Sequence, residues 1–176
     1  MILVVLIAVL FLGGVLAWLS EGLSPKAPRV IALTAVIVDL LLMLTLVGGD
    51  ADGASWIVQL NGQWIPQFGI SFHLAADGLS VLMMVLAAIL GVVAIGSAWD
   101  EITDRVGFFY FNLLWTLAGV IGVFTALDLF LFFFFWEVML IPMYFIIAIW
   151  GHENKNYAAP QESWIDEQIA ANTDFD

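Results

Sequence analysis

Two carboxylic acids, Asp39 and Glu137, lie within apolar stretches that carry no other charged residue. An ionised side chain at the centre of a bilayer costs roughly 2.5–3.5 kcal/mol on insertion scales. Such an acid is therefore kept there either with a partner or in its protonated form. Both states suit a side chain that takes up and releases protons, so these residues favour proton chemistry inside a membrane.

Glu137 is the stronger candidate of the two. It is expected near the middle of a helix, in an aromatic environment that includes Phe133 and Tyr144 at helical spacing. Pro142, five residues further on, lacks a backbone donor, so it is expected to kink the helix and to make room for water near the acid. The sequence therefore predicts Glu137 as a proton relay, supported by Pro142 and Tyr144. The alternative is a protonated glutamate that makes one interhelical hydrogen bond.

Asp39 is subject to the same argument with weaker support. The only polar neighbours in its stretch are Thr34 and Thr45, and no proline accompanies it. A lone aspartate of this kind is either uncharged or faces another subunit. We treat Asp39 as a supporting residue of the candidate site.

The composition requires lipid as the solvent for most of the chain. Of its 176 residues 63% are hydrophobic and 11% are charged, whereas soluble domains carry about 25% charged residues. A hydrocarbon core of about 30 Å needs about 20 apolar residues of helix. Five stretches meet this length, at about 1–19, 30–49, 79–99, 106–127 and 129–150, with a tight turn near Asp128 between the last two. The predicted fold is an all-α membrane protein, a bundle of about five transmembrane helices.

The basic residues predict the orientation of the bundle. All of them fall on one side of a five-span chain: Lys26, Arg29, Arg105 and Lys155. Tryptophans end three of the spans at that same side: Trp18, Trp99 and Trp150. Basic loops stay in the cytoplasm and indole rings favour the membrane interface. We therefore expect the N-terminus outside and the tail in the cytoplasm.

The loop between the second and third spans is the longest segment outside the expected helices. It holds two short runs of β-forming residues around Asn61-Gly62, a pair typical of a type I′ hairpin turn. The sequence therefore predicts a β-hairpin that turns at this pair. The alternative is an irregular loop whose Trp56 and Trp64 dip into the interface.

Charge and composition exclude several classes of function. A net charge of −12 argues against nucleic acid as a partner. The absence of cysteine excludes thiolate metal sites and iron–sulfur clusters. The two histidines, His73 and His152, are expected on opposite sides of the membrane, so they cannot form one metal site. Any redox chemistry must come from a partner.

The fourth and fifth spans resemble a known family. The resemblance rests on the runs Gly107–Trp115 and Gly119–Phe124, and on the segment from Leu127 to His152 that contains Trp-Glu-x-x-Leu-x-Pro ending at Pro142. These residues are similar to subunit M of the bacterial proton-pumping NADH–quinone oxidoreductase, respiratory complex I, whose mitochondrial counterpart is chain 4. The resemblance covers about residues 1–159.

The resemblance implies a fold, a role and partners. Subunits of this type have about fourteen transmembrane helices, look like antiporters and carry a proton route coupled to electron transfer from NADH to quinone. Glu137 matches a glutamate that in the family pairs with a lysine on a later helix, whereas Asp39 has no recognised counterpart. NADH, FMN, iron–sulfur clusters and quinone bind other subunits, so no cofactor is expected here. The expected partners are the other membrane-arm subunits and the lipid bilayer of the bacterial inner membrane.

The resemblance is expected to end near Pro160. The domain at 1–157 is then the transmembrane bundle, and 158–176 is a tail with five acids and no base. We expect this tail to be the disordered or frameshifted end of an incomplete gene. Two other functions stay open. Multisubunit Na⁺/H⁺ antiporters share the antiporter-like core, and a shortened chain could be a membrane stub that serves only in assembly.

Overall fold

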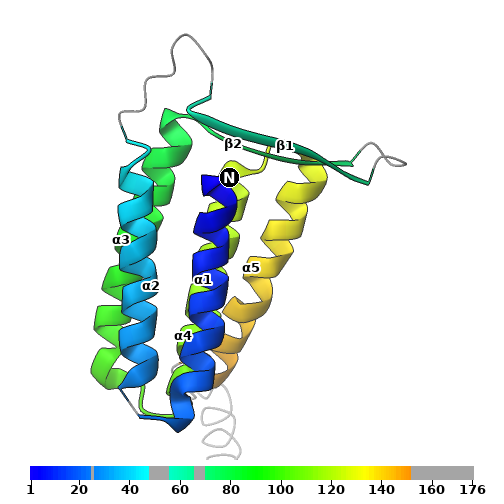
Figure 1. Ribbon diagram of the computed structural model, residues 1–176. Helices are drawn as coiled ribbons and strands as arrows, with labels where there is room; N and C mark the ends of the chain where they lie inside the picture. The colour runs from blue at the N-terminus through cyan, green and yellow to red at the C-terminus, as the bar shows by residue number, and fades with distance from the viewer. Residues whose placement is uncertain (25, 48–55, 66–69, 152–176) are drawn as a thin grey trace, which may run out of the picture.

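The computed structural model describes residues 1–24, 26–47, 56–65 and 70–151. Five long helices lie side by side, and a two-stranded antiparallel sheet crosses one end of them (Figure 1). The helices are α1 (Ile2–Leu19), α2 (Ala27–Leu44), α3 (Gly78–Glu101), α4 (Val106–Thr125) and α5 (Leu129–Trp150), with a short 3₁₀ turn η1 (Ser20–Gly22) after α1. The strands are β1 (Val58–Ile65) and β2 (Ile70–Ala76). The expected tail at 158–176, His152 and Lys155 lie outside the described residues.

All five predicted spans are helices, and the largest difference in their limits concerns α2. This helix runs over Ala27–Leu44 rather than 30–49. It begins earlier because Pro28 fits the first helical turn, where its missing N–H is not needed. It ends earlier because Thr45, Leu46 and Val47 donate to carbonyls three residues back, which tightens the helix into a turn.

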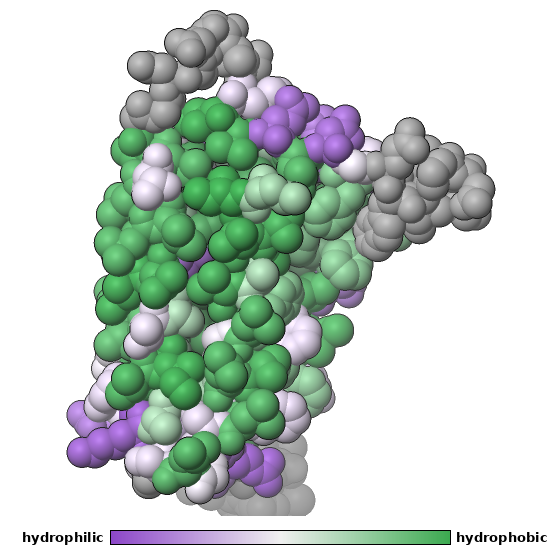
Figure 2. Space-filling model, viewed as in Figure 1, coloured by the Kyte–Doolittle hydropathy of each residue, from purple (hydrophilic) through white to green (hydrophobic). Residues whose placement is uncertain are grey.

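Apolar side chains cover the middle of the bundle. In Figure 2 the green, hydrophobic residues form a broad band over the helices, and the hydrophilic residues gather toward the two ends. Each of the five helices is long and apolar enough to cross a membrane. The predicted all-α membrane fold is therefore confirmed.

Small residues allow α4 to approach its neighbours closely. Gly14 of α1 faces the main chain of Phe111, where an added Cβ would lie 3.3 Å from the carbonyl oxygen. On the other side of α4, an added Cβ at Gly119 would lie 2.7 Å from Met139 Cβ, and one at Gly122 would collide with the Phe135 ring. Close packing of this kind holds membrane helices together, because lipid provides no hydrophobic drive for association.

The hairpin forms, but the predicted position of its turn is wrong. Asn61 and Gly62 lie inside β1, opposite His73 and Phe72 of β2. The pairing partner of β1 is thus a segment further along the chain, and the connection between the strands lies outside the described residues. This register buries Leu74 and its two following alanines against the helices. Burial of one strand has overridden the local turn preference of Asn-Gly.

The sheet is attached to the corner between α4 and α5. The N–H of Leu127 donates to the His73 carbonyl at 3.0 Å, and Ala126 forms a β-bridge with Leu74. The Asp128 carboxylate accepts from the N–H and the hydroxyl of Ser71, at 3.4 and 3.3 Å, and it also caps the start of α5. The predicted turn near Asp128 is confirmed, and the sheet fixes where α5 begins.

Aromatic and basic residues gather at the opposite end of the bundle. The Arg29 guanidinium donates to the Ile102 carbonyl at 2.9 Å and lies 6.0 Å from the Trp99 ring centroid. The Trp150 indole N–H donates to the Asp104 carbonyl at 3.0 Å. The basic residues that the structure describes therefore lie at the same end as the three tryptophans, as predicted. They are Lys26, Arg29 and Arg105. The side of the membrane on which this end lies stays a prediction.

Candidate functional site on the outer face of α5

Glu137 is carried by α5, whose start is fixed by Asp128. The Asp128 carboxylate accepts from the N–H groups of Phe130 and Leu131, at 2.9 and 3.3 Å, which satisfies two of the donors that every helix start leaves free. Glu137 follows eight residues after Leu129, about 12 Å along the helix. The acid is thus in the interior of the span, as predicted.

The side chain of Glu137 is exposed, and so is the face around it. Aromatic residues at helical spacing share this face, with Phe133 56% and Tyr144 69% exposed. Within the described part of the chain, the Glu137 carboxylate makes no hydrogen bond or ion pair. Phe133 and Tyr144 of its own helix therefore supply the aromatic environment expected for the acid, and no other helix among the described residues encloses it.

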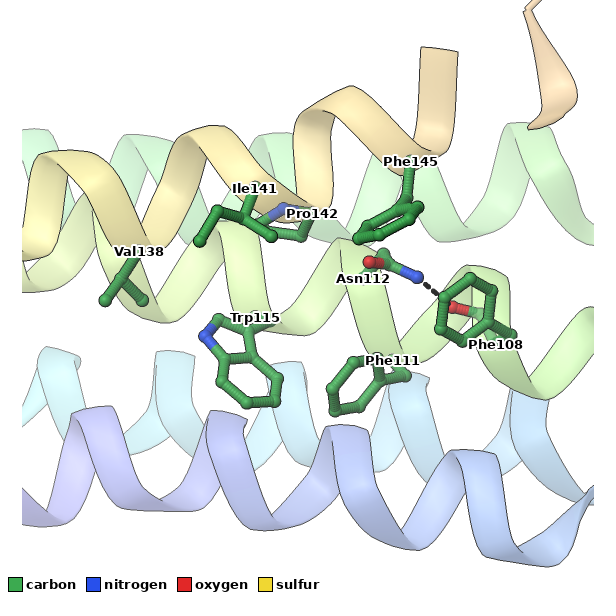
Figure 3. Close-up of a pocket in the computed structure, with 8 residues that line it drawn as sticks. All are labelled: Phe108, Phe111, Asn112, Trp115, Val138, Ile141, Pro142 and Phe145. Atoms are coloured by element: carbon green, nitrogen blue, oxygen red, sulfur yellow. Dashed lines mark hydrogen bonds between the residues drawn. The ribbon is translucent and has the colours of Figure 1, made fainter. Parts of the chain in front are cut away.

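A groove between α4 and α5 lies on another side of the same helix. It has a volume of about 180 Å³ and is almost wholly apolar. Pro142 and Val138 line it from α5, and Phe111, Asn112 and Trp115 line it from α4 (Figure 3). Because proline has no N–H, the Val138 carbonyl lacks its usual helical donor on this side. Helix α5 nevertheless continues as one element through Pro142, which is itself buried.

Asn112 is a polar residue that the sequence reasoning did not single out. Its side chain is buried and its Nδ2 donates to the Phe108 carbonyl at 2.7 Å, as the dashed line in Figure 3 marks. It is the one amide within the fourth span, which is the signal that could have drawn attention to it. The groove therefore has a polar group in its wall, next to Pro142.

The structure does not bring Asp39 and Glu137 together. The Asp39 side chain is only 1% exposed and is enclosed by the helices around α2, so it does not face outward toward another subunit. Neither of its carboxylate oxygens has a hydrogen-bond partner among the described residues. Glu137 lies on the open face of α5. The two acids therefore occupy separate sites: the Asp39 site is enclosed by helices, and the Glu137 site is exposed.

The polar residues at the hairpin end have local roles. His73 Nε2 lies 2.6 Å from Gln59 Nε2 across the sheet. Asp77 caps α3 by accepting from the Ser80 N–H at 2.7 Å, and these hydrogen bonds lower the pKa of Asp77. No group of three histidine, aspartate or glutamate side chains in the described ranges could hold a metal ion.

Comparison with known proteins finds a family model and relatives that are similar to this chain. The model of the family "NADH:quinone oxidoreductase/Mrp antiporter, TM" matches residues 126–171, which include all of α5. NADH-quinone oxidoreductase subunit M of Pseudomonas aeruginosa is 52% identical over 164 residues, which cover 89% of this chain and 32% of that protein. The subunit M of Escherichia coli K12 is also 52% identical, over 84% of this chain and 30% of its own length.

The chain is homologous to part of NADH-quinone oxidoreductase subunit M. This confirms the resemblance found in the sequence. The chain spans about a third of the length of the curated subunit M proteins that it matches.

A solved structure agrees with the fold. A chain of respiratory complex I from Thermus thermophilus with bound NADH has a TM-score of 0.72 to this one, with 23% identity over 90% of this chain and 31% of that chain. At this identity the likeness concerns the fold alone. Most of this chain therefore has the arrangement found in part of a chain of that complex.

Proposed function

We propose that this chain serves as part of a membrane-arm subunit of a proton-translocating NADH:quinone oxidoreductase. The observation that carries the proposal is the 52% identity to subunit M over most of the chain. Because the chain spans a third of that subunit, the activity belongs to the complete subunit within its complex. NADH, FMN, iron–sulfur clusters and quinone are then bound by other subunits, and the end of the bundle that carries Lys26, Arg29 and Arg105 faces the cytoplasm.

Within that subunit we propose Glu137 as the protonatable relay. A carboxylate in the interior of a span is too costly to face lipid, so its exposed face has to be covered by protein or water that the described part of this chain does not supply. The resemblance to subunit M implies that a lysine of a later helix is the partner. Protonation of the acid then changes with the charge of that lysine, because an opposite charge within about 4–6 Å favours the ionised form. Pro142 and Tyr144 are supporting residues, next to the acid on the same helix.

The test is Glu137→Gln in a complete subunit M within the assembled complex. Glutamine keeps the size and the hydrogen-bonding capacity of the side chain but cannot carry a proton as an acid. We expect normal assembly and the loss of most of the proton transport driven by NADH oxidation, measured in membrane vesicles with a pH-sensitive dye. The matched control is Glu101→Gln at the exposed end of α3, which should leave proton transport unchanged.

Unchanged proton transport in the Glu137→Gln complex would refute the relay role. If Glu101→Gln lowered it equally, the effect would belong to charge in general and not to this site. Assembly is followed separately, by the NADH-oxidising activity and the subunit content of the purified complex. A folding defect is thereby distinguished from a loss of proton transfer.

A second candidate function is a subunit of a multisubunit Na⁺/H⁺ antiporter, which the double name of the matched family favours. The same Glu137 face suits that function, since exchange of a cation for a proton also needs a protonatable acid. Rescue of growth at high salt by the complete subunit, in membranes without NADH-dependent proton transport, would favour the antiporter. NADH-dependent transport without salt rescue would favour the first proposal.

A further inference from the structure

Asp39 is a buried acid that the proposed relay does not use. It lies in α2, five residues before the helix ends at Leu44, on the side of the bundle that carries the hairpin. The side chain is 1% exposed, and neither Oδ1 nor Oδ2 accepts a hydrogen bond from any residue that the structure describes. A buried polar group without a partner is rare in folded proteins and calls for an explanation.

No side chain of the helices packed around α2 offers Asp39 a positive charge, and the α-amino group that precedes α1 belongs to Met1, which is 81% exposed. Helix α1 has no ionisable side chain, and the first turn after it, η1, has only the exposed Glu21 at the far end of the bundle. Helix α3 has Asp100 and Glu101, both in its last turn at that same far end, and α4 has Tyr110 near its start there. The only base of α2 is Arg29.

Arg29 is too far from the acid to neutralise it. Ten residues separate Arg29 from Asp39, about 15 Å along the helix. The Arg29 guanidinium is also engaged by the Ile102 carbonyl and lies beside the Trp99 ring. An ionised Asp39 would therefore be an unpaired charge in an apolar interior, which costs far more than its neutral form.

The neutral acid still lacks an acceptor for its O–H. The two threonines of the same stretch do not serve Asp39: Thr34 Oγ1 donates to the Val30 carbonyl at 2.7 Å and Thr45 Oγ1 donates to the Leu42 carbonyl at 2.6 Å, and neither hydroxyl forms a hydrogen bond with the acid. A water molecule can supply both the acceptor and the donor that a carboxylic acid needs. The unpartnered oxygens thus suit a protonated acid in exchange with water.

A groove lies between α2 and α3 at the hairpin end of the bundle. It has a volume of about 390 Å³, and Leu44 and Val85 are among the residues that line it. An added Cβ at Gly91 of α3 would lie 3.5 Å from Val36, so these two residues are level in the antiparallel pair. Because the two helices run in opposite directions, Asp39, three residues after Val36, lies opposite Ala88, three residues before Gly91. Val85, which lines the groove, lies three residues before Ala88, about 4.5 Å along α3.

We propose that Asp39 is a second proton-binding site of the bundle. Its carboxyl group is protonated at neutral pH and exchanges its proton with water that enters between α2 and α3 from the hairpin end. The ligand is a proton with its water of hydration. This site is independent of the proposed function, because Glu137 lies on another helix and on its open face.

The experiment is infrared spectroscopy of the full chain in lipid nanodiscs, with ¹³C in the side-chain carboxyl of every aspartate. The label shifts the C=O band of a protonated aspartic acid and leaves glutamic acids unshifted, so Asp39 is separated from Glu137 without any substitution. The other aspartates that the structure describes lie at helix ends or outside the helices: Asp77, Asp100, Asp104 and Asp128. We expect one isotope-shifted band of protonated carboxyl at pH 7, which moves further when H₂O is replaced by D₂O.

Two outcomes with the wild-type chain would overturn the proposal. If the isotope-shifted band is absent at pH 7, Asp39 is ionised. If the band is present but does not respond to D₂O, the acid is a sealed structural residue and not an exchanging site. Asp39→Asn should remove the band, and Glu137→Gln should leave it in place, so failure of the proposed relay does not affect this result.

The entry route has its own variant and control. Val85→Phe narrows the groove and should slow the deuterium shift of the Asp39 band about tenfold. Val93→Phe makes the same change on an exposed part of α3 and should leave the rate unchanged. Equal exchange rates in the two variants would exclude this groove as the route.

Discussion

Helices α4 and α5 are consecutive and similar in length, with 20 and 22 residues, yet they differ sharply in burial. In the most apolar 18-residue stretch of each, 56% of the residues of α4 are buried and 17% of those of α5. Helix α4 packs against α1, α2, α3 and α5, whereas α5 packs along one face, on α4. Helix α4 is the centre of this bundle, and α5 is its edge.

The difference shows how to read an exposed residue in a membrane protein. An exposed Phe133 on α5 is uninformative, because lipid covers an aromatic side chain at little cost. An exposed carboxyl group in the interior of the same helix cannot be covered in that way. Glu137 therefore marks the open face of α5 as one that requires protein or water, and Asp39 marks the closed part of the bundle as one that contains an unsatisfied acid.

The largest effect is expected from a substitution that separates α5 from α4. Gly122→Leu places a side chain where the Phe135 ring already lies, so the two helices cannot keep their spacing. Overpacking of this kind should destabilise the folded chain by about 3 kcal/mol. The measurement is the unfolding of the full chain in mixed detergent micelles on titration with a denaturing detergent, followed by circular dichroism.

Gly96→Leu is the matched control for this prediction. Gly96 is also inside a helix, α3, but an added Cβ there meets nothing within 4 Å. Leucine is a better helix former than glycine, so this variant should be as stable as the wild type or more stable by up to about 1 kcal/mol. Equal destabilisation by both substitutions would refute the close contact between α4 and α5.

A pair of phenylalanines on α5 tests the asymmetry of that helix directly. Phe135 is 4% exposed and packs on α4, whereas Phe133 is 56% exposed on the open side. Phe135→Ala should cost roughly 2 kcal/mol or more, since it leaves a cavity against Gly122. Phe133→Ala should change the unfolding free energy by no more than about 0.5 kcal/mol. Similar costs for the two substitutions in the same detergent titration would mean that α5 packs on both faces.

The sequence predicts the spans well because a bilayer requires a minimum length of apolar helix and favours aromatic or polar residues where the helix ends. The number of helices, the turn at Asp128 and the shared end of the tryptophans follow from apolar length, a single acid between two spans, and aromatic residues at an interface. The site residue Glu137 also follows from the sequence, since a charged residue in the interior of a span is rare. Its placement inside α5 needs only the helical rise and the limits of the span.

What the sequence could not predict depends on contacts between distant segments. Asn61-Gly62 favours a turn locally, and only the burial of β2 against the helices places the pair inside a strand. Nor could a pattern within one span decide that Asp39 is enclosed while Glu137 is open. Both acids occupy similar positions in apolar helices, and the difference comes from how many neighbours each helix has.

The smallest effect concerns the corner that joins the two helices. Partial desolvation acts to raise the pKa of Asp128, but hydrogen bonds from Ser71, Leu131 and Phe130 outweigh it and lower that pKa. A carboxyl group whose pKa is lower in the folded state stabilises that state above its unfolded pKa, near 3.9. This stabilisation is lost as the pH falls through the folded value.

Asp128→Asn should therefore weaken the acid dependence of stability and little else. Asparagine is also a good N-cap, so the start of α5 is kept and stability at pH 7 should change only slightly. Between pH 5 and pH 3 the variant should lose less stability than the wild type in thermal unfolding of the full chain. Asp77, which also has a lowered pKa, is present in both proteins and contributes to the acid dependence that remains. Asp100→Asn, at an exposed position of α3, should leave the wild-type dependence unchanged. A steeper acid loss in Asp128→Asn would mean that the corner does not hold an ionised carboxylate, and that α5 is fixed to the sheet by its backbone contacts alone.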